Sequence, residues 1–159
     1  MNGAAIVVRR AAIEDLDRIV AFNAAIAVET EGKKLDPRTL RDGVRAALSD
    51  PHRSLYFLAE VEGVVAGQTM VTFEWSDWRN NHFWWIQSVY VDPRFRRRGV
   101  FRALHEYIRG AARSRPDVCG LRLYVHKENH RAMNTYRELG MPLSDYLMCE
   151  EDWSPTSAG

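Results

Sequence analysis

The stretch from Val89 to Leu104 is the part of the sequence whose residue types and spacing most clearly suggest chemistry. An apolar run leads into a short basic segment, and a helical pattern begins at Gly99. The first turn of a helix offers unpaired N–H groups and a partial positive charge, and glycine there lets a ligand approach the backbone closely. Five arginines surround this point: Arg94, Arg96, Arg97, Arg98 and Arg102. The stretch therefore predicts a polyphosphate site, although it matches neither GxGxxG nor GxxxxGK[ST].

Charge alone would fit a solvated basic surface equally well, but two motifs favour a ligand site. Residues 96–101 (Arg-Arg-Arg-Gly-Val-Phe) resemble the [QR]-x-x-G-x-[GA] signature of the GNAT superfamily, the acyl-CoA-dependent N-acyltransferases. Residues 129–141 resemble the later N-x-x-A-x-x-x-Y-x-x-x-G-[FM] helix of that family. The sixth signature position departs from the family, because Phe101 stands where Gly or Ala is usual. If Phe101 packs toward the core, the phosphate loop is retained. If Phe101 faces the phosphates, the loop has a lower affinity for the cofactor or a different shape.

The resemblance implies acetyl-CoA as the acyl donor and a set of residues that would hold it. Backbone groups of the strand before the signature, at Val89, Tyr90 and Val91, would pair with the pantetheine arm and stabilise charge developing on the thioester oxygen. Asn129 would contact the cofactor arm, or serve only as a helix cap. The pyrophosphate would lie among the amides and side chains of Arg96, Arg97, Arg98, Gly99, Val100, Phe101 and Arg102.

Tyr136 matches the family's tyrosine that protonates the departing thiolate. A phenol has a pKa of ~10 and a thiol of ~8.5, so this proton transfer is not grossly mismatched. The alternative is that Tyr136 is a core residue, since it follows Ala132 by one turn on an apolar helix face.

The acceptor amine must lose a proton before it attacks, and Glu74 is the preferred base because large aromatic residues flank it. We expect further acceptor contacts from Glu29, Glu31, Asp77 and Trp85, with both glutamates in a loop between the first two helices. Four of five tryptophans fall within eleven residues and could form an aromatic wall for a cationic amine. Solvated acids and a hairpin or dimer patch of tryptophans are the alternative interpretations.

The sequence therefore predicts an N-acetyltransferase that moves an acetyl group from acetyl-CoA to a primary amine, most simply a small cationic molecule, by direct transfer in a ternary complex. The alternative is a non-catalytic acyl-CoA sensor of the same fold. A net charge of +1 argues against a nucleic-acid partner. No metal is expected, because His126 and His130 lack a third ligand at a familiar spacing. The sequence leaves open whether the chain forms a homodimer.

Composition indicates one globular domain over residues 1–159, with an ordered core over about 5–150 and a frayed tail over 154–159. Hydrophobic residues make up 46% and charged residues 27% of the chain. We expect a cytoplasmic protein without membrane contact, since no run approaches the ~18 apolar residues of a membrane span and no signal peptide is recognisable. Cys119 and Cys149 should be free thiols.

Hydrophobic periodicity predicts an α/β fold (an α+β mixed sheet flanked by helices) in the order β-α-α-β-β-β-α-β-α-β. The core stripe of the helix over 99–115 should include Leu104, Tyr107 and Ile108. The expected strands are 6–8, 55–61, 64–73, 83–91, 121–125 and 144–149, and the expected helices are 14–26, 37–50, 99–115 and 129–139.

Overall fold

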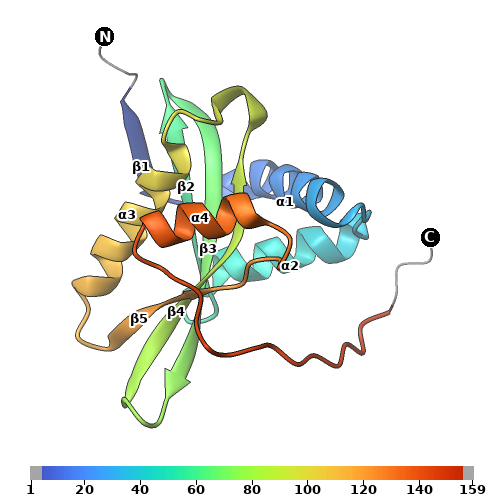
Figure 1. Ribbon diagram of the computed structural model, residues 1–159. Helices are drawn as coiled ribbons and strands as arrows, with labels where there is room; N and C mark the ends of the chain where they lie inside the picture. The colour runs from blue at the N-terminus through green and yellow to red at the C-terminus, as the bar shows by residue number, and fades with distance from the viewer. Residues whose placement is uncertain (1–4, 156–159) are drawn as a thin grey trace. The chain divides into compact units, whose positions relative to one another are not determined.

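The computed structural model describes residues 5–155 and confirms the mixed sheet flanked by helices (Figure 1). Its strands are β1 (Ile6–Arg10), β2 (Leu55–Val61), β3 (Val64–Ser76), β4 (Asn81–Val91) and β5 (Val118–Leu123). Its helices are α1 (Leu16–Glu31), α2 (Pro37–Ser49), α3 (Val100–Arg113) and α4 (His130–Glu138), with short 3-10 turns η1 (Ile13–Asp15) and η2 (Pro93–Phe95).

The five strands form one sheet in the order β1-β2-β3-β4-β5, antiparallel throughout except for the parallel pair β4–β5. Successive side chains of β2 show which helices cover which face. Tyr56 and Leu58 pack in a cluster with residues of α1 and α2, whereas the Phe57 ring contacts Tyr107 of α3. The pair α1–α2 and the helix α3 therefore cover opposite faces of the sheet (Figure 1).

Turns and caps form where the sequence predicts them. Glu62 and Gly63 both have positive φ, 52° and 76°, as a tight hairpin turn between β2 and β3 requires. The Asp36 side chain accepts a hydrogen bond from the Thr39 N–H at 2.7 Å and so begins α2. Gly140 follows α4 at φ 82°, the left-handed conformation expected after a helix end.

The expected strand over 144–149 is wrong, because these described residues are in no strand. The large apolar side chains of this segment are exposed, Leu147 at 94% and Tyr146 at 80%. A lone extended segment leaves its backbone N–H and C=O groups unpaired, so apolar content without a neighbouring strand does not produce a strand.

The expected loop at Glu29 and Glu31 is also wrong, since both belong to the last turn of α1. The helix continues to Gly32, which adopts φ 63°. The N–H of Gly32 donates to Val28 and that of Lys33 to Ala27, both at 3.1 Å, so the left-handed glycine closes the helix after the acids.

The buried residues of α3 agree only in part with the predicted core stripe. Tyr107 is 43% exposed, whereas His105 is 1% exposed. The remaining buried residues of α3 are Val100, Leu104, Ile108 and Ala112.

The chain divides into two compact units, one reaching Leu123 and the other starting at Tyr124. The first holds the sheet and α1 to α3, and the second holds α4 and the segment after it. The single domain over 1–159 stays a prediction. Of the tail expected to fray, residues 156–159 lie outside the described part of the chain.

Gly67 lets β3, β4 and α3 approach closely. A Cβ added there would lie 2.9 Å from the Tyr90 carbonyl oxygen and 2.9 Å from Cγ1 of Val100. The Tyr90 carbonyl oxygen is a backbone atom, so it cannot move away from an added Cβ without a shift of β4.

We expect Gly67→Ala to lower the free energy of unfolding by about 1–3 kcal/mol, because the methyl group overfills a close backbone contact. Urea unfolding followed by circular dichroism measures the change. Gly43→Ala is the matched control, since Gly43 lies inside α2 with nothing within 4 Å of an added Cβ. The control should be neutral or stabilising by up to about 1 kcal/mol. Equal effects of the two substitutions would contradict the close-contact argument.

Candidate functional site

β4 carries a bulge in its second half, and this bulge defines the site. Gln68 pairs with Tyr90, and Met70 pairs with Gln87, so two residues of β4 stand opposite one residue of β3. Ser88, within the bulge, has φ 51°, a left-handed conformation that is uncommon for a residue other than glycine. The bulge therefore alters the direction of the backbone that follows it.

Among the described residues, the second half of β4 is also paired with a strand on one edge only. Its parallel pairing with β5 ends at Ile86 and Leu123, while β4 continues to Val91. Within the described residues, the positions from Gln87 onward have no strand beside them on that edge. Val89, Tyr90 and Val91, the residues predicted to pair with the pantetheine arm, lie on this open stretch.

The segment after β4 turns sharply into α3. Arg97 has φ 64° and Gly99 has φ 83°, and α3 begins at the buried Val100. A Cβ added to Gly99 would meet nothing within 4 Å, so the space before the first turn of α3 is open. The amides of this turn and the positive end of the helix point to an anion site, as the sequence predicts.

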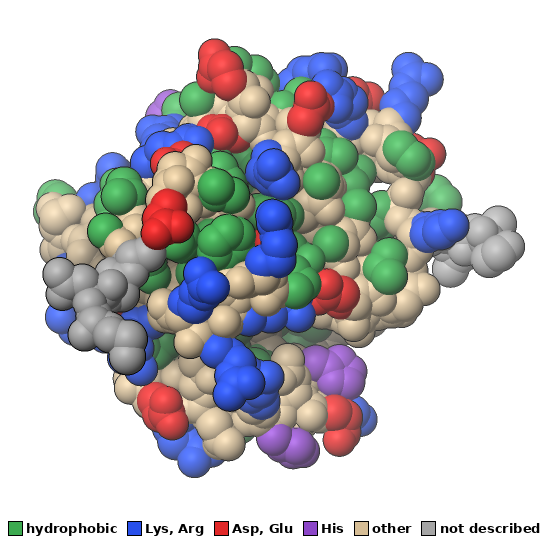
Figure 2. All heavy atoms as spheres, turned by 90° about the horizontal axis from the view of Figure 1, so that it is seen from above, with side chains coloured by type: hydrophobic (Ala, Val, Ile, Leu, Met, Phe, Trp, Pro, Cys, Tyr) green, Lys and Arg blue, Asp and Glu red, His purple; other side chains and the backbone are tan. Residues whose placement is uncertain are grey.

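The arginines around this turn differ in what they contact. Arg94 forms an ion pair with Asp92 at 2.8 Å, and Arg98 lies over the Phe95 ring at 5.6 Å. The side chains of Arg97 and Arg102 are exposed and form no ion pair with any described residue. Seen from above, Lys and Arg side chains run through the middle of the visible face (Figure 2). Arg97 and Arg102 are thus the best placed to neutralise a polyphosphate.

Glu29 and Arg96 join the end of α1 to the end of β4. Arg96 donates to Glu29 Oε2 at 2.7 Å and, through Nε, to the Val91 carbonyl at 2.9 Å. The Tyr90 hydroxyl donates to Glu29 Oε1 at 3.1 Å. Burial, and next the Glu29 carboxylate, raise the pKa of Tyr90, so this hydroxyl keeps its proton at neutral pH. Glu29, predicted on the acceptor side, thus contacts Tyr90 of β4 and Arg96 of the predicted phosphate loop.

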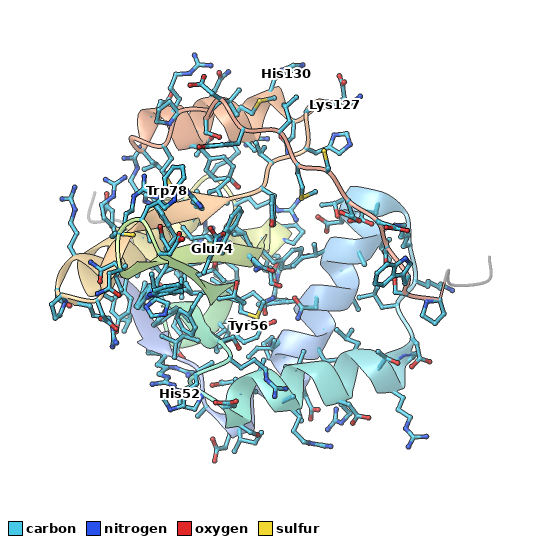
Figure 3. The ribbon with its side chains drawn as sticks, turned by 90° about the horizontal axis from the view of Figure 1, so that it is seen from below. His52, Tyr56, Glu74, Trp78, Lys127 and His130 are labelled. Carbon is cyan, nitrogen blue, oxygen red and sulfur yellow. The ribbon has the colours of Figure 1, made fainter. Side chains whose placement is uncertain are left out.

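Glu74 lies near the turn of the β3–β4 hairpin, within a cluster of polar and aromatic side chains (Figure 3). Its carboxylate accepts from Trp85 Nε1 at 2.6 Å and from Arg122 at 2.7 Å. Arg122 also lies over the Phe83 ring at 3.7 Å. The structure therefore brings the predicted residues Glu74 and Trp85 together.

The two other predicted acids have different hydrogen-bond and ion-pair partners. Glu31 forms an exposed ion pair with Lys33 at 2.8 Å. Asp77 lies in the loop between β3 and β4, where it accepts from the Trp78 N–H at 2.9 Å. Neither contact involves Glu74 or Trp85.

Phe101 is half-buried, and its ring packs against His105, one turn further along α3, at 6.1 Å between centroids. His105 lies on the buried side of the helix. Phe101 thus packs against a residue of its own helix, and which of the two expected effects it has on the phosphate loop stays a prediction.

Asn129 and Tyr136 belong to the second unit. The Asn129 side chain accepts from the Ala132 N–H at 3.0 Å and so caps α4, as predicted. Tyr136 is half-buried, and burial raises the pKa of its phenol. The hydroxyl therefore keeps its proton at neutral pH and can act as a donor.

Sequence reasoning missed a buried polar group beneath the bulge, formed by Asn23, Tyr56 and Gln68. Gln68 is 0% exposed although its side chain is polar, and Thr69 beside it in β3 is 1% exposed. Two consecutive polar residues in the middle of a strand that begins with an apolar run are the signal that could have indicated this group. Among the described residues, no group of three or more His, Cys, Asp or Glu could hold a metal ion. No helix in that part of the chain is long and apolar enough to cross a membrane.

Comparisons with known proteins agree with this geometry. A sequence profile of the acetyltransferase (GNAT) family matches residues 16–141. A possible acetyltransferase from Clostridium difficile 630 is 47% identical, with a TM-score of 0.87, over 92% of this chain and 97% of that one. A predicted acetyltransferase from Clostridium acetobutylicum, crystallised with acetyl-CoA, shares the fold at 16% identity, with a TM-score of 0.75, over 92% and 96% of the two chains. No curated protein matches the chain significantly.

His105 predicts how stability depends on pH. Burial, and next the positive charges of Arg109 and Arg102, lower its pKa below the usual 6.5, and Glu106 opposes this only in part. Below about pH 6.5 the unfolded chain binds a proton that the folded chain does not, so the free energy of unfolding falls as the pH drops.

We expect His105→Gln to flatten the fall in unfolding free energy between pH 7 and pH 5, measured by urea unfolding at each pH. His52→Gln is the control, because His52 is exposed. A wild-type slope that persists in His105→Gln would contradict the assignment.

Proposed function

Since the chain belongs to the acetyltransferase (GNAT) family, we propose that it transfers the acetyl group of acetyl-CoA to a primary amine by direct transfer in a ternary complex. The observation that carries the proposal is the open edge of β4 after Ile86, which leads directly into the basic first turn of α3. An extended polar arm with a polyphosphate at one end matches this sequence of backbone groups followed by an anion site.

The residues of the first unit fit such a donor. Backbone groups of Val89 to Val91 would pair with the pantetheine arm, and the amides from Arg97 to Phe101, at the turn into α3, would bind the pyrophosphate. Arg97 and Arg102 supply positive charge that no described acid neutralises. Arg96 would act differently, since it already binds Glu29 and the Val91 carbonyl. Asn129 stays in the proposal as a contact to the cofactor arm.

Acetyl-CoA supplies a thioester, whose carbonyl carbon forms the new C–N bond while the C–S bond breaks. Fixed N–H dipoles of β4 stabilise the negative charge that develops on the carbonyl oxygen, because they need no reorganisation. A base takes the proton that the amine loses. Tyr136 gives its phenolic proton to the leaving thiolate, and its raised pKa keeps that proton available at neutral pH.

We propose a small cationic amine as the acceptor and Glu74 as the base or the binding carboxylate. Glu74, Trp85 and Arg122 form one connected cluster on neighbouring strands. An incoming ammonium group would compete with Arg122 for the Glu74 oxygen, and the Trp85 ring could contribute about 0.5–2 kcal/mol of cation–π stabilisation. Glu31 and Asp77 would add negative charge at the edge of the acceptor surface.

We also propose a cytoplasmic location. Cys119 and Cys149 are both free and exposed, and exposed thiols persist where the compartment is reducing.

Calorimetric titration with acetyl-CoA tests donor binding. We expect micromolar affinity for acetyl-CoA and a loss of at least tenfold for acetyl-pantetheine, which lacks the nucleotide and its pyrophosphate. Replacing both Arg97 and Arg102 by Ala should weaken acetyl-CoA binding by at least tenfold and leave acetyl-pantetheine binding unchanged. The control is Arg38→Ala, since Arg38 is exposed on α2. Absent binding of acetyl-CoA at millimolar concentration would contradict the proposal.

Tyr136→Phe separates an enzyme from a sensor that only binds acyl-CoA. We expect kcat, measured as thiol release with a panel of amines, to fall by about 10²–10⁴-fold, while the Kd for acetyl-CoA stays unchanged. Tyr146→Phe is the control, because Tyr146 is an exposed tyrosine of the same unit. Wild-type turnover in Tyr136→Phe would exclude its role as proton donor. Acetyl-CoA binding without turnover of any amine by the wild-type chain would favour the sensor.

A further inference from the structure

The left-handed conformation of Ser88 needs an explanation within the fold. A residue other than glycine at φ 51° in a strand is strained, and such a conformation persists only where its surroundings determine it strongly. Ser88 immediately precedes Val89, the first residue of the open stretch of β4. The conformation of Ser88 therefore sets the direction of the backbone that the proposed function uses.

Three side chains from three different elements surround Ser88. Gln68 of β3 donates through Nε2 to the Ser88 carbonyl at 3.3 Å and to Asn23 Oδ1 at 2.8 Å. Asn23 of α1 donates through Nδ2 to the Tyr56 hydroxyl at 3.0 Å. Tyr56 lies on β2, and the Ser88 side chain opposes the rise in the pKa of Tyr56 that burial causes. These contacts form a polar network that links α1, β2 and β3 to the strained residue.

Burial makes the hydrogen bonds of this polar network costly to break. Gln68 is 0% exposed and Tyr56 is 4% exposed, so a broken hydrogen bond here would leave a polar group without water. Gln68 Oε1 has no hydrogen-bond partner among the described residues, so the amide is oriented by its two N–H bonds. An apolar side chain of similar size would fill this core position without that cost. The hydrogen bonds that Gln68 donates to Asn23 and to the Ser88 carbonyl therefore explain why a glutamine occupies this position.

We propose that Asn23, Tyr56 and Gln68 are positioning residues that hold Ser88 in its left-handed conformation and so aim the backbone of residues 89–91 at the acyl donor. The inference rests on the proposed function and deepens it. None of the three needs to contact the donor, because each acts through Ser88. A displacement of about 1 Å at a reacting centre can lower a rate a hundredfold, so a small relaxation of the bulge is enough to matter.

Tyr56→Phe is the sharpest test, because it removes one hydroxyl and keeps the buried ring that packs with Leu58. The matched control is Ser54→Ala, which also removes a buried hydroxyl bonded to a protein atom, here the Ala47 carbonyl at 3.2 Å. Ser54 is 2% exposed, and its hydroxyl donates to a residue of α2 rather than to the bulge. We expect both variants to fold and to lose similar, small amounts of stability.

Two measurements on the full chain give the outcome. Hydrogen exchange of the amides in residues 86–91 should accelerate at least tenfold in Tyr56→Phe and stay at the wild-type rate in Ser54→Ala. The kcat of acetyl transfer should fall about tenfold to a hundredfold in Tyr56→Phe at an unchanged KM for acetyl-CoA, and should stay unchanged in Ser54→Ala.

Wild-type exchange and kcat in Tyr56→Phe would overturn the inference. Equal losses in both variants would also overturn it, because the effect would then be general destabilisation. A raised KM for acetyl-CoA with normal kcat would assign the network to donor binding and overturn the positioning role. If the wild-type chain transfers acetyl to no amine, the proposed function fails, and the exchange measurement still decides whether the network holds the bulge.

Discussion

The demand of backbone groups for hydrogen-bond partners is the constraint on which this structure depends. β4 satisfies it along both edges as far as Ile86 and along one edge only beyond that residue. An interior strand that is left open in this way is rare unless something else fills the gap. The bulge at Ser88, the close approach at Gly67 and the turn at Gly99 all lie around this open half of β4. The candidate site thus lies where β4, within the described residues, has no neighbouring strand on one edge.

Charge around the open edge is partly balanced within the chain. Arg94 and Arg96 each have a carboxylate partner, Asp92 and Glu29, while Arg97 and Arg102 have none among the described residues. Ion pairs at this exposure contribute little to stability, so they orient the loop more than they stabilise the fold. A net charge of +1 is therefore compatible with a strongly basic point at one helix end.

Sequence patterns predicted most of the fold because strands and helices here have regular apolar periods and recognisable caps. The strand at 144–149 failed because its apolar content says nothing about whether a neighbouring strand exists. Glu29 and Glu31 were assigned to a loop because acids and a glycine look alike in a turn and at a helix end. The phosphate-loop residues were predicted from a local motif. The polar network around Ser88 was not predicted, because Asn23, Tyr56 and Gln68 are far apart in sequence and only the fold joins them.

The bulge also shifts the alternation of side chains along β4. Before it, even-numbered residues such as Trp84 and Ile86 are buried on the opposite face from Gln87. After it, the even-numbered Tyr90 lies on the same face as Gln87, with two residues between them, and its ring contacts Phe22 of α1 at 4.9 Å. An unbroken strand would direct the side chain of residue 90 to the face covered by α3. The extra residue of the bulge therefore places the Tyr90 ring against α1.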